Sequence, residues 1–209
     1  MLTDIKIPKE IFELSAELDF YLGADFSIFL RLNHREVKNI HFFSPNFVPE
    51  IKFSRIKNIF LSFSSIEMKI FRFEDYKIYF IRYPYETISK SNILLYDFFV
   101  KVQSVYDDFC LKMNMALNSR DKREFLENIT DIYCILSYVK EFDFQTYYVR
   151  KYGFEFDKDM MEEIRKGLAL INQEDIEDFL LSSKLYFSFD FSEISVRILK
   201  FLNSLYSAG

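Results

Sequence analysis

Apolar side chains recur every three or four residues through the C-terminal half of the chain, which is the spacing of an amphipathic helix. The first stripe consists of Phe98, Val102, Tyr106, Phe109 and Met113. Two further stripes run over residues 125–139 and 191–205. All four prolines lie within the first 84 residues, and proline is strongly disfavoured inside helices. The pattern therefore predicts that residues 90–209 are almost entirely helical.

The N-terminal half alternates short apolar runs with turns. A helical pattern over residues 7–18 precedes a short strand that ends at Gly23, then a second helix and a strand candidate over 37–43. Two alternating runs joined at Glu74-Asp75 read as neighbouring strands of a meander. The predicted fold class is α+β, with a small mixed sheet over about residues 18–86 and a helical C-terminal half. We expect residues 1–90 to form an α/β core and residues 91–209 a helical part packed on it as one structural unit.

Composition narrows the class of protein. Half of the residues are hydrophobic and 19% are aromatic, which supplies a core and excludes the signature of intrinsic disorder. The net charge of −5 lacks the broad basic signal of nucleic-acid binders. Residues 1–90 carry 13 basic and 12 acidic side chains, whereas residues 91–209 carry 14 and 20, so the acidity belongs to the helical half.

The sequence also predicts the cellular compartment of the protein. Cys110 and Cys134 are far apart and form no C-x-x-C arrangement, which favours a reducing compartment over a disulfide framework. The first residues lack the basic and continuous apolar regions of a signal peptide. No stretch approaches the roughly 20 apolar residues of a membrane span. We expect a cytoplasmic protein with no membrane partner.

Gly23 is the first candidate for a functional position. It is the only glycine before Gly153, and it lies between a predicted strand and a predicted helix. A glycine there permits a tight turn, which is one interpretation. The other is a turn that faces a phosphate, because the free N–H groups and the dipole of a helix N-terminus favour an anion.

Several short motifs follow Gly23 in order along the chain. They are His34-Arg35, Phe42-Phe43, Tyr83-Pro84-Tyr85, Lys101 and Asp131-Ile132-Tyr133. Over roughly residues 10–140 this order resembles the AbiEii/AbiGii toxin-type nucleotidyltransferase family. The resemblance implies a nucleotidyltransferase-type sheet, with Lys101 at the place of the family's helical lysine. It also implies a nucleotide triphosphate and Mg²⁺ as cofactors if the chain is active.

The departures from the family pattern concern the chemistry itself. An Asp-x-Asp pair places two carboxylates on one side of a strand, where they hold Mg²⁺. Here these two positions are Asn39 and His41, which supply neutral donors. The family's Gly-Gly-Ser/Thr turn becomes Gly23-Ala24-Asp25, which puts an acid beside the turn. The usual Mg²⁺-dependent transfer is therefore not expected, and we assign neither a catalytic residue nor a metal ligand.

By analogy with the fold of this family, we predict a binding groove on one face of the sheet. Its lining residues and the other candidates for substrate binding are Gly23, Asp25, Arg35, Asn39, His41, Lys101 and Asp131. Each also has a structural interpretation. His41, between two apolar residues, reads as a half-buried packing residue, Lys101 as a solvated charge and Asp131 as a local ion-pair partner.

Three functions remain open at this point. The first is a catalytically degenerate nucleotidyltransferase-fold protein that binds a nucleotide, an RNA or a protein. The second is an active transferase of a toxin–antitoxin or abortive-infection system, with carboxylates from Asp25 and from Glu74 or Asp75. The third is a non-enzymatic interaction module. The expected partners are accordingly a nucleotide or RNA, or else an antitoxin or another protein.

Overall fold

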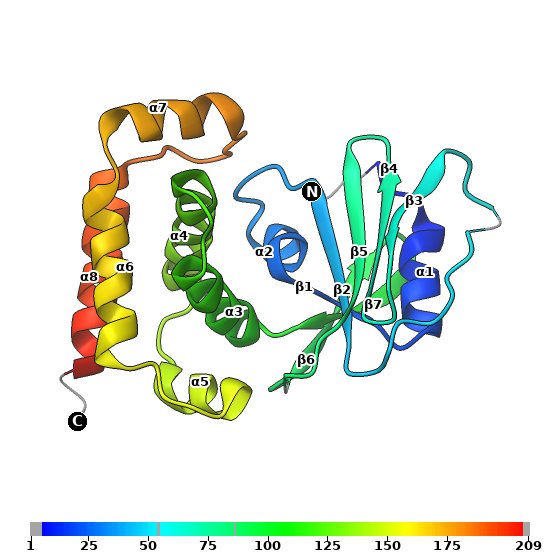
Figure 1. Ribbon diagram of the computed structural model, residues 1–209, viewed down its shortest axis with the longest axis horizontal. Helices are drawn as coiled ribbons and strands as arrows, with labels where there is room; N and C mark the ends of the chain where they lie inside the picture. Colours follow the sequence, from blue (N-terminus) through cyan, green and yellow to red (C-terminus); the bar gives the residue numbers. More distant parts are fainter. Residues whose placement is uncertain (1–5, 54, 86, 207–209) are drawn as a thin grey trace. The chain divides into compact units, whose positions relative to one another are not determined.

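The computed structural model describes residues 6–53, 55–85 and 87–206 (Figure 1). Within these residues seven strands come first and most of the helices follow, so the α+β class is confirmed. The chain divides into two compact units. The first comprises the residues up to Arg31 together with Val37–Ser104, and the second comprises Leu32–Glu36 and the residues from Val105 onward.

The first unit is a mixed sheet with two helices. Its helices are α1 (Lys9–Glu17) and α2 (Ala24–Leu32). Its strands are β1 (Tyr21–Gly23), β2 (Asn39–Ser44), β3 (Ile59–Ser64), β4 (Met68–Phe73), β5 (Tyr76–Arg82), β6 (Lys90–Leu95) and β7 (Phe98–Gln103). The sheet order is β3-β4-β5-β2-β1-β7-β6. The pairs β2–β5 and β1–β7 are parallel, and the other neighbours are antiparallel.

One face of this sheet packs against an apolar core. Phe12 from α1 and Phe26 from α2 join Phe42 and Phe80 from the central strands, and all four are buried. The ring of Phe12 meets that of Phe42 edge-on, with 5.8 Å between the centroids. Full burial of a phenylalanine contributes about 1.5–3 kcal/mol, so these rings fix which face of each strand turns inward.

The prediction of a helix over residues 90–103 is wrong. These residues form the hairpin β6–β7, with Leu95 paired to Phe98 and a turn in which Tyr96 has a φ of 55°. On β7 the side chains of Val100 and Val102 are buried, whereas that of Lys101 is exposed, which is an alternation of period two. A spacing of four residues, as between Phe98 and Val102, satisfies both a helix and a strand, so the stripe was ambiguous there. Lys101 consequently lies on a strand.

The second unit is helical, as predicted for its part of the chain. Its helices are α3 (Val105–Leu117), α4 (Lys122–Tyr138), α5 (Phe144–Tyr152), α6 (Lys158–Leu170), α7 (Gln173–Ser182) and α8 (Phe191–Tyr206). Side chains cap several helix starts; Asp121, for example, accepts a hydrogen bond from the backbone N–H of Glu124. Gly153 ends α5 with a φ of 81°, a conformation that glycine adopts without strain. Over the described residues, no helix combines the length and the apolar character that crossing a bilayer requires.

Candidate functional site

The turn at Gly23 is explained by packing. Gly23 ends β1, and a Cβ atom built there would lie 2.6 Å from Cε2 of Phe43 and 2.8 Å from Cδ of Gln103. No side chain fits at those distances unless its neighbours move. The next residue, Ala24, has a φ of 56°, so the backbone turns tightly into α2. These contacts favour the tight-turn interpretation of Gly23.

Asp25 occupies the N-terminal turn of α2. Its side chain is buried. A carboxylate there interacts favourably with the helix dipole, which is the same interaction that a bound phosphate would use. Because the acidic side chain of Asp25 already occupies this helix end, the phosphate-facing interpretation of the turn gains no support.

We expect the substitution Gly23→Ala to destabilise the protein by about 1–3 kcal/mol, the usual cost of overpacking. The added methyl group must displace either the ring of Phe43 or the side chain of Gln103. Urea unfolding followed by circular dichroism measures the effect. Ala24→Gly is the matched control, since it changes the same turn without adding an atom. A stability loss that is equal in the two variants would contradict the packing explanation.

Asn39 and His41 lie together on the sheet face opposite the core. On β2 the side chains of Ile40 and Phe42 are fully buried, whereas those of Asn39 and His41 are half-buried and alternate with them. His41 is also the register partner of Gly23 on β1. The prediction that these two side chains share one side of a strand beside Gly23 is confirmed. The imidazole of His41 stacks on the ring of Tyr79, with 4.6 Å between the centroids.

These residues do not fit Mg²⁺, which requires hard oxygen donors and gives up its bound waters reluctantly. The register partners of Asn39 and His41 on β5 are Lys77 and Tyr79, so the neighbouring strand adds no carboxylate. Asp75 is 81% exposed and lies 3.5 Å from the ammonium of Lys38. Across the described residues no three His, Cys, Asp or Glu side chains converge on a point where they could hold a metal ion.

The face that carries Asn39 and His41 is basic. Residues paired on neighbouring strands project to the same side of a sheet. The registers therefore place two rows of side chains across β3, β4, β5 and β2. The rows are Phe60–Arg72–Lys77–Asn39 and Phe63–Ile70–Tyr79–His41. We call these eight residues the basic face.

Arg72 and Lys77 give the basic face its charge. They are directly opposite each other on β4 and β5, and both are exposed. Like charges in that position destabilise a strand pair. Neither side chain forms an ion pair with another residue of the described ranges. The arrangement leaves a pair of cations available to an anionic ligand.

Arg35 and Asp131 meet in the second unit, in a buried ion cluster. The guanidinium of Arg35 donates from Nε to Oδ1 of Asp131 at 2.8 Å and from Nη2 to Oδ2 at 2.9 Å. His34 Nε2 lies 2.6 Å from Oδ1, and the ammonium of Lys112 lies 2.7 Å from Oδ2. All four side chains are at most 8% exposed. Burial raises the pKa of the Asp131 carboxyl, but the charges of Arg35 and Lys112 outweigh it and hold that pKa well below its usual range.

This cluster anchors the segment 32–36 to the helices of the second unit. Asp131 lies on α4 and Lys112 on α3, where its ammonium also donates to Oδ1 of Asn128 at 3.0 Å. The geometry supports a structural role for these contacts, since their atoms are closed to solvent. A role of Arg35 and Asp131 in substrate binding stays a prediction.

Lys112 and Asn128 were missed by the sequence analysis. Lys101, chosen there as the helical lysine, is 50% exposed on β7 and lies 2.9 Å from the carboxylate of Asp19. Lys112 is the lysine that belongs to a helix and contacts Asp131. The available signal was its place between Phe109 and Met113, since a charge within an apolar stripe is buried only when it is paired.

A separate hollow of about 1170 Å³ lies in the second unit, between the end of α4, the start of α5 and α8. Its lining includes Arg150 and Arg197 as well as Glu141, Asp143 and Glu155. Charges of both signs select no particular ligand charge. None of the candidate residues from the sequence lines it.

Comparison with known proteins gives no family for this chain, so the function proposed below rests on the geometry of the structure. No protein-family model matches the chain, and a search of curated proteins finds no match either.

Proposed function

We propose that this chain is a nucleotidyltransferase-fold protein, similar to AbiEii-type toxins, that binds a nucleotide without a metal ion and lacks the usual Mg²⁺-dependent transfer. The observation that carries the proposal is the pair Asn39 and His41 on β2, which lies beside Gly23 of β1. A strand, a tight turn and a helix precede this pair, as the resemblance requires. Neutral side chains at the two positions cannot offset the cost of stripping water from Mg²⁺.

The basic face supplies a replacement for the metal. In a nucleotidyltransferase the dication neutralises the triphosphate, and here Arg72 and Lys77 offer two positive charges on the same face. The stacked rings of His41 and Tyr79 offer a surface for the base. The amide of Asn39, in the row of Lys77, can hydrogen-bond to the ligand.

We expect adenosine and guanosine triphosphates to bind at least as tightly in EDTA as in Mg²⁺, because a bound dication shields the phosphates from Arg72 and Lys77. Calorimetric titration under both conditions measures this. Lys77→Gln should weaken binding about tenfold, the value of one charge-assisted contact. Lys52→Gln is the matched control, since Lys52 is an exposed lysine that lines a hollow beside α1.

Binding that requires Mg²⁺, together with transfer of labelled nucleotide to RNA, would overturn the proposal in favour of an active transferase toxin. Absence of any nucleotide binding would favour an interaction module that recognises an antitoxin or another protein. The double substitution Asn39→Asp with His41→Asp should create a Mg²⁺ site. If it gains no Mg²⁺ affinity, the two positions do not correspond to the family's metal-binding pair.

A further inference from the structure

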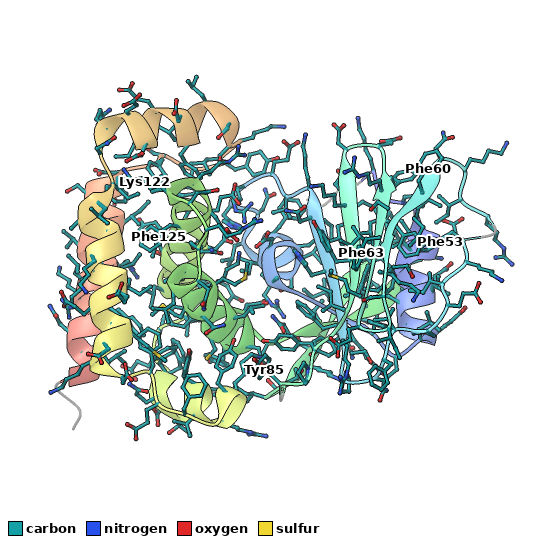
Figure 2. All side chains as sticks on the ribbon, viewed as in Figure 1. Phe53, Phe60, Phe63, Tyr85, Lys122 and Phe125 are labelled. Carbon is teal, nitrogen blue, oxygen red and sulfur yellow. The ribbon has the colours of Figure 1, made fainter. Side chains whose placement is uncertain are left out.

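The edge strand β3 displays two aromatic side chains on the basic face. Phe60 is 65% exposed and Phe63 is 46% exposed, and Figure 2 labels both on this strand. Residues three apart on a regular strand project to opposite faces. Here the register shifts between Leu61 and Phe63, so that Phe60 pairs with Arg72 and Phe63 pairs with Ile70.

A β-bulge at Ser62 causes this shift. The hydroxyl of Ser62 donates to the backbone carbonyl of Ile70 at 3.0 Å. Bulges re-aim side chains and are common beside functional sites. Without the bulge, Phe63 would share the face of Leu61, whose register partner Phe71 belongs to the core. The bulge therefore brings a second exposed aromatic ring to the side that carries the cations.

The rings and the cations form one continuous surface. From β3 to β2 there are three strand spacings, which is about 14 Å. Along this length Phe60 and Phe63 lie at one end, Arg72 and Lys77 in the middle, and the His41–Tyr79 stack at the other. A single base can stack at only one end of this surface, so the aromatic rings at the other end remain for a second base.

The charge of this surface differs from that of the chain as a whole. The strand positions that project to this side across all seven strands include Lys90 and Lys101 as well as Arg72 and Lys77, and none of them is Asp or Glu. Three acidic side chains of the first unit, Glu10, Glu13 and Glu17, lie on α1, whereas the carboxylate of Asp19 lies 2.9 Å from the ammonium of Lys101. The strand positions of this face are therefore basic, although the chain as a whole carries a net charge of −5.

We propose that the basic face binds a single-stranded polynucleotide, with bases stacked on Phe60 and Phe63 and phosphates at Arg72 and Lys77. The inference rests on the proposed nucleotide site at His41 and Tyr79 and extends it toward the edge of the sheet. A single strand is the fitting partner because its unpaired bases expose the faces that aromatic side chains stack on. A duplex hides those faces, so it offers no base for Phe60 and Phe63 to stack on.

Fluorescence anisotropy with labelled oligonucleotides of about 12 residues tests the proposal in EDTA. The probes are oligoadenylate and oligouridylate, as RNA and as DNA. We expect either substitution, Phe60→Ser or Phe63→Ser, to weaken binding about tenfold. Leu61→Ser is the matched control: Leu61 is 54% exposed on the same strand but projects to the other face, and this variant should bind as the unmodified protein does.

The salt dependence supplies a second readout. Replacing Arg72 and Lys77 with glutamine should reduce the slope of log affinity against log salt by about 1.4, since each contact with a single strand contributes about 0.7. Lys52→Gln should leave the slope unchanged. Binding of RNA alone indicates a contact to the 2′-hydroxyl, whereas equal binding of DNA indicates recognition of bases and phosphates only; either result supports the proposal.

Oligonucleotides that bind no more tightly than a nucleoside triphosphate would overturn this inference and leave the proposed nucleotide site standing. Equal loss of affinity in Leu61→Ser and Phe63→Ser would also overturn it. If neither oligonucleotide nor nucleotide binds, the proposed function fails as well. The two failures are therefore distinguishable.

Discussion

The substitution Asp131→Asn is expected to destabilise the protein by about 3–5 kcal/mol, the cost of breaking a buried ion pair from one side. The carboxylate of Asp131 receives contacts from His34, Arg35 and Lys112 at 2.6–2.9 Å. An asparagine is almost the same size, so the variant loses the negative charge without opening a cavity. The positive charges of Arg35 and Lys112 then stay buried and lose the negative charge of Asp131, which offsets part of their desolvation cost. Urea unfolding of the full chain at neutral pH measures the loss.

Asp19→Asn is the matched control for Asp131→Asn. Asp19 also lies 2.9 Å from an ammonium, that of Lys101, but its side chain is 66% exposed. An exposed pair contributes about 0.2–1 kcal/mol, so the control should change stability little. Similar losses in the two variants would mean that burial is not what makes the Asp131 cluster important.

The buried ion cluster around Asp131 predicts that the stability of the protein depends on pH. The pKa of Asp131 is lower in the folded protein than in the unfolded chain, where it is about 4, because of Arg35 and Lys112. As the pH falls through about 4, the unfolded chain binds a proton at Asp131 that the folded protein does not bind. The stability of the folded protein therefore decreases as the pH falls. The stability gap between the unmodified protein and Asp131→Asn should be complete above about pH 5 and should narrow progressively below about pH 4. A gap that stays constant down to pH 3 would contradict this assignment.

The strand that carries Asn39 and His41 was predictable because its alternation is short and unambiguous. Ile40 and Phe42 can be buried together only if the residues between them face the other way. Gly23 likewise predicted the tight turn between β1 and α2. Position and orientation of this pair could therefore be read from the residues, although their chemistry could not.

The ion cluster could not be predicted, because its members are far apart in sequence. His34 and Asp131 are separated by 97 positions, and only the packing of helices brings them together. The basic face was hidden for another reason. Phe60 and Phe63 have the spacing of opposite faces, and nothing in the sequence indicates a bulge at Ser62. Bulges depend on pairing with a neighbouring strand, which a single sequence does not reveal.

For a second buried ion pair, Asp107 with Lys151, we expect replacement of both partners to cost less stability than replacement of either one. The ammonium of Lys151 on α5 lies 2.9 Å from Oδ1 of Asp107 on α3, and both side chains are fully buried. Either single change, Lys151→Met or Asp107→Leu, removes one charge of this contact, so the opposite charge stays buried and loses that partner. We expect each to destabilise the protein by about 3–5 kcal/mol.

The double variant should recover most of that loss, because a buried ion pair replaced by apolar residues of similar volume is often neutral or stabilising. The coupling energy from the four proteins should then be at least about 2 kcal/mol, measured by urea unfolding. The exposed pair Asp19 and Lys101, taken through the same cycle, should give a coupling below about 1 kcal/mol. Additive losses in the buried cycle would instead show that Asp107 and Lys151 each stabilise the helices through other contacts. In that case α3 and α5 would depend on a wider polar network, and the ion pair itself would contribute little.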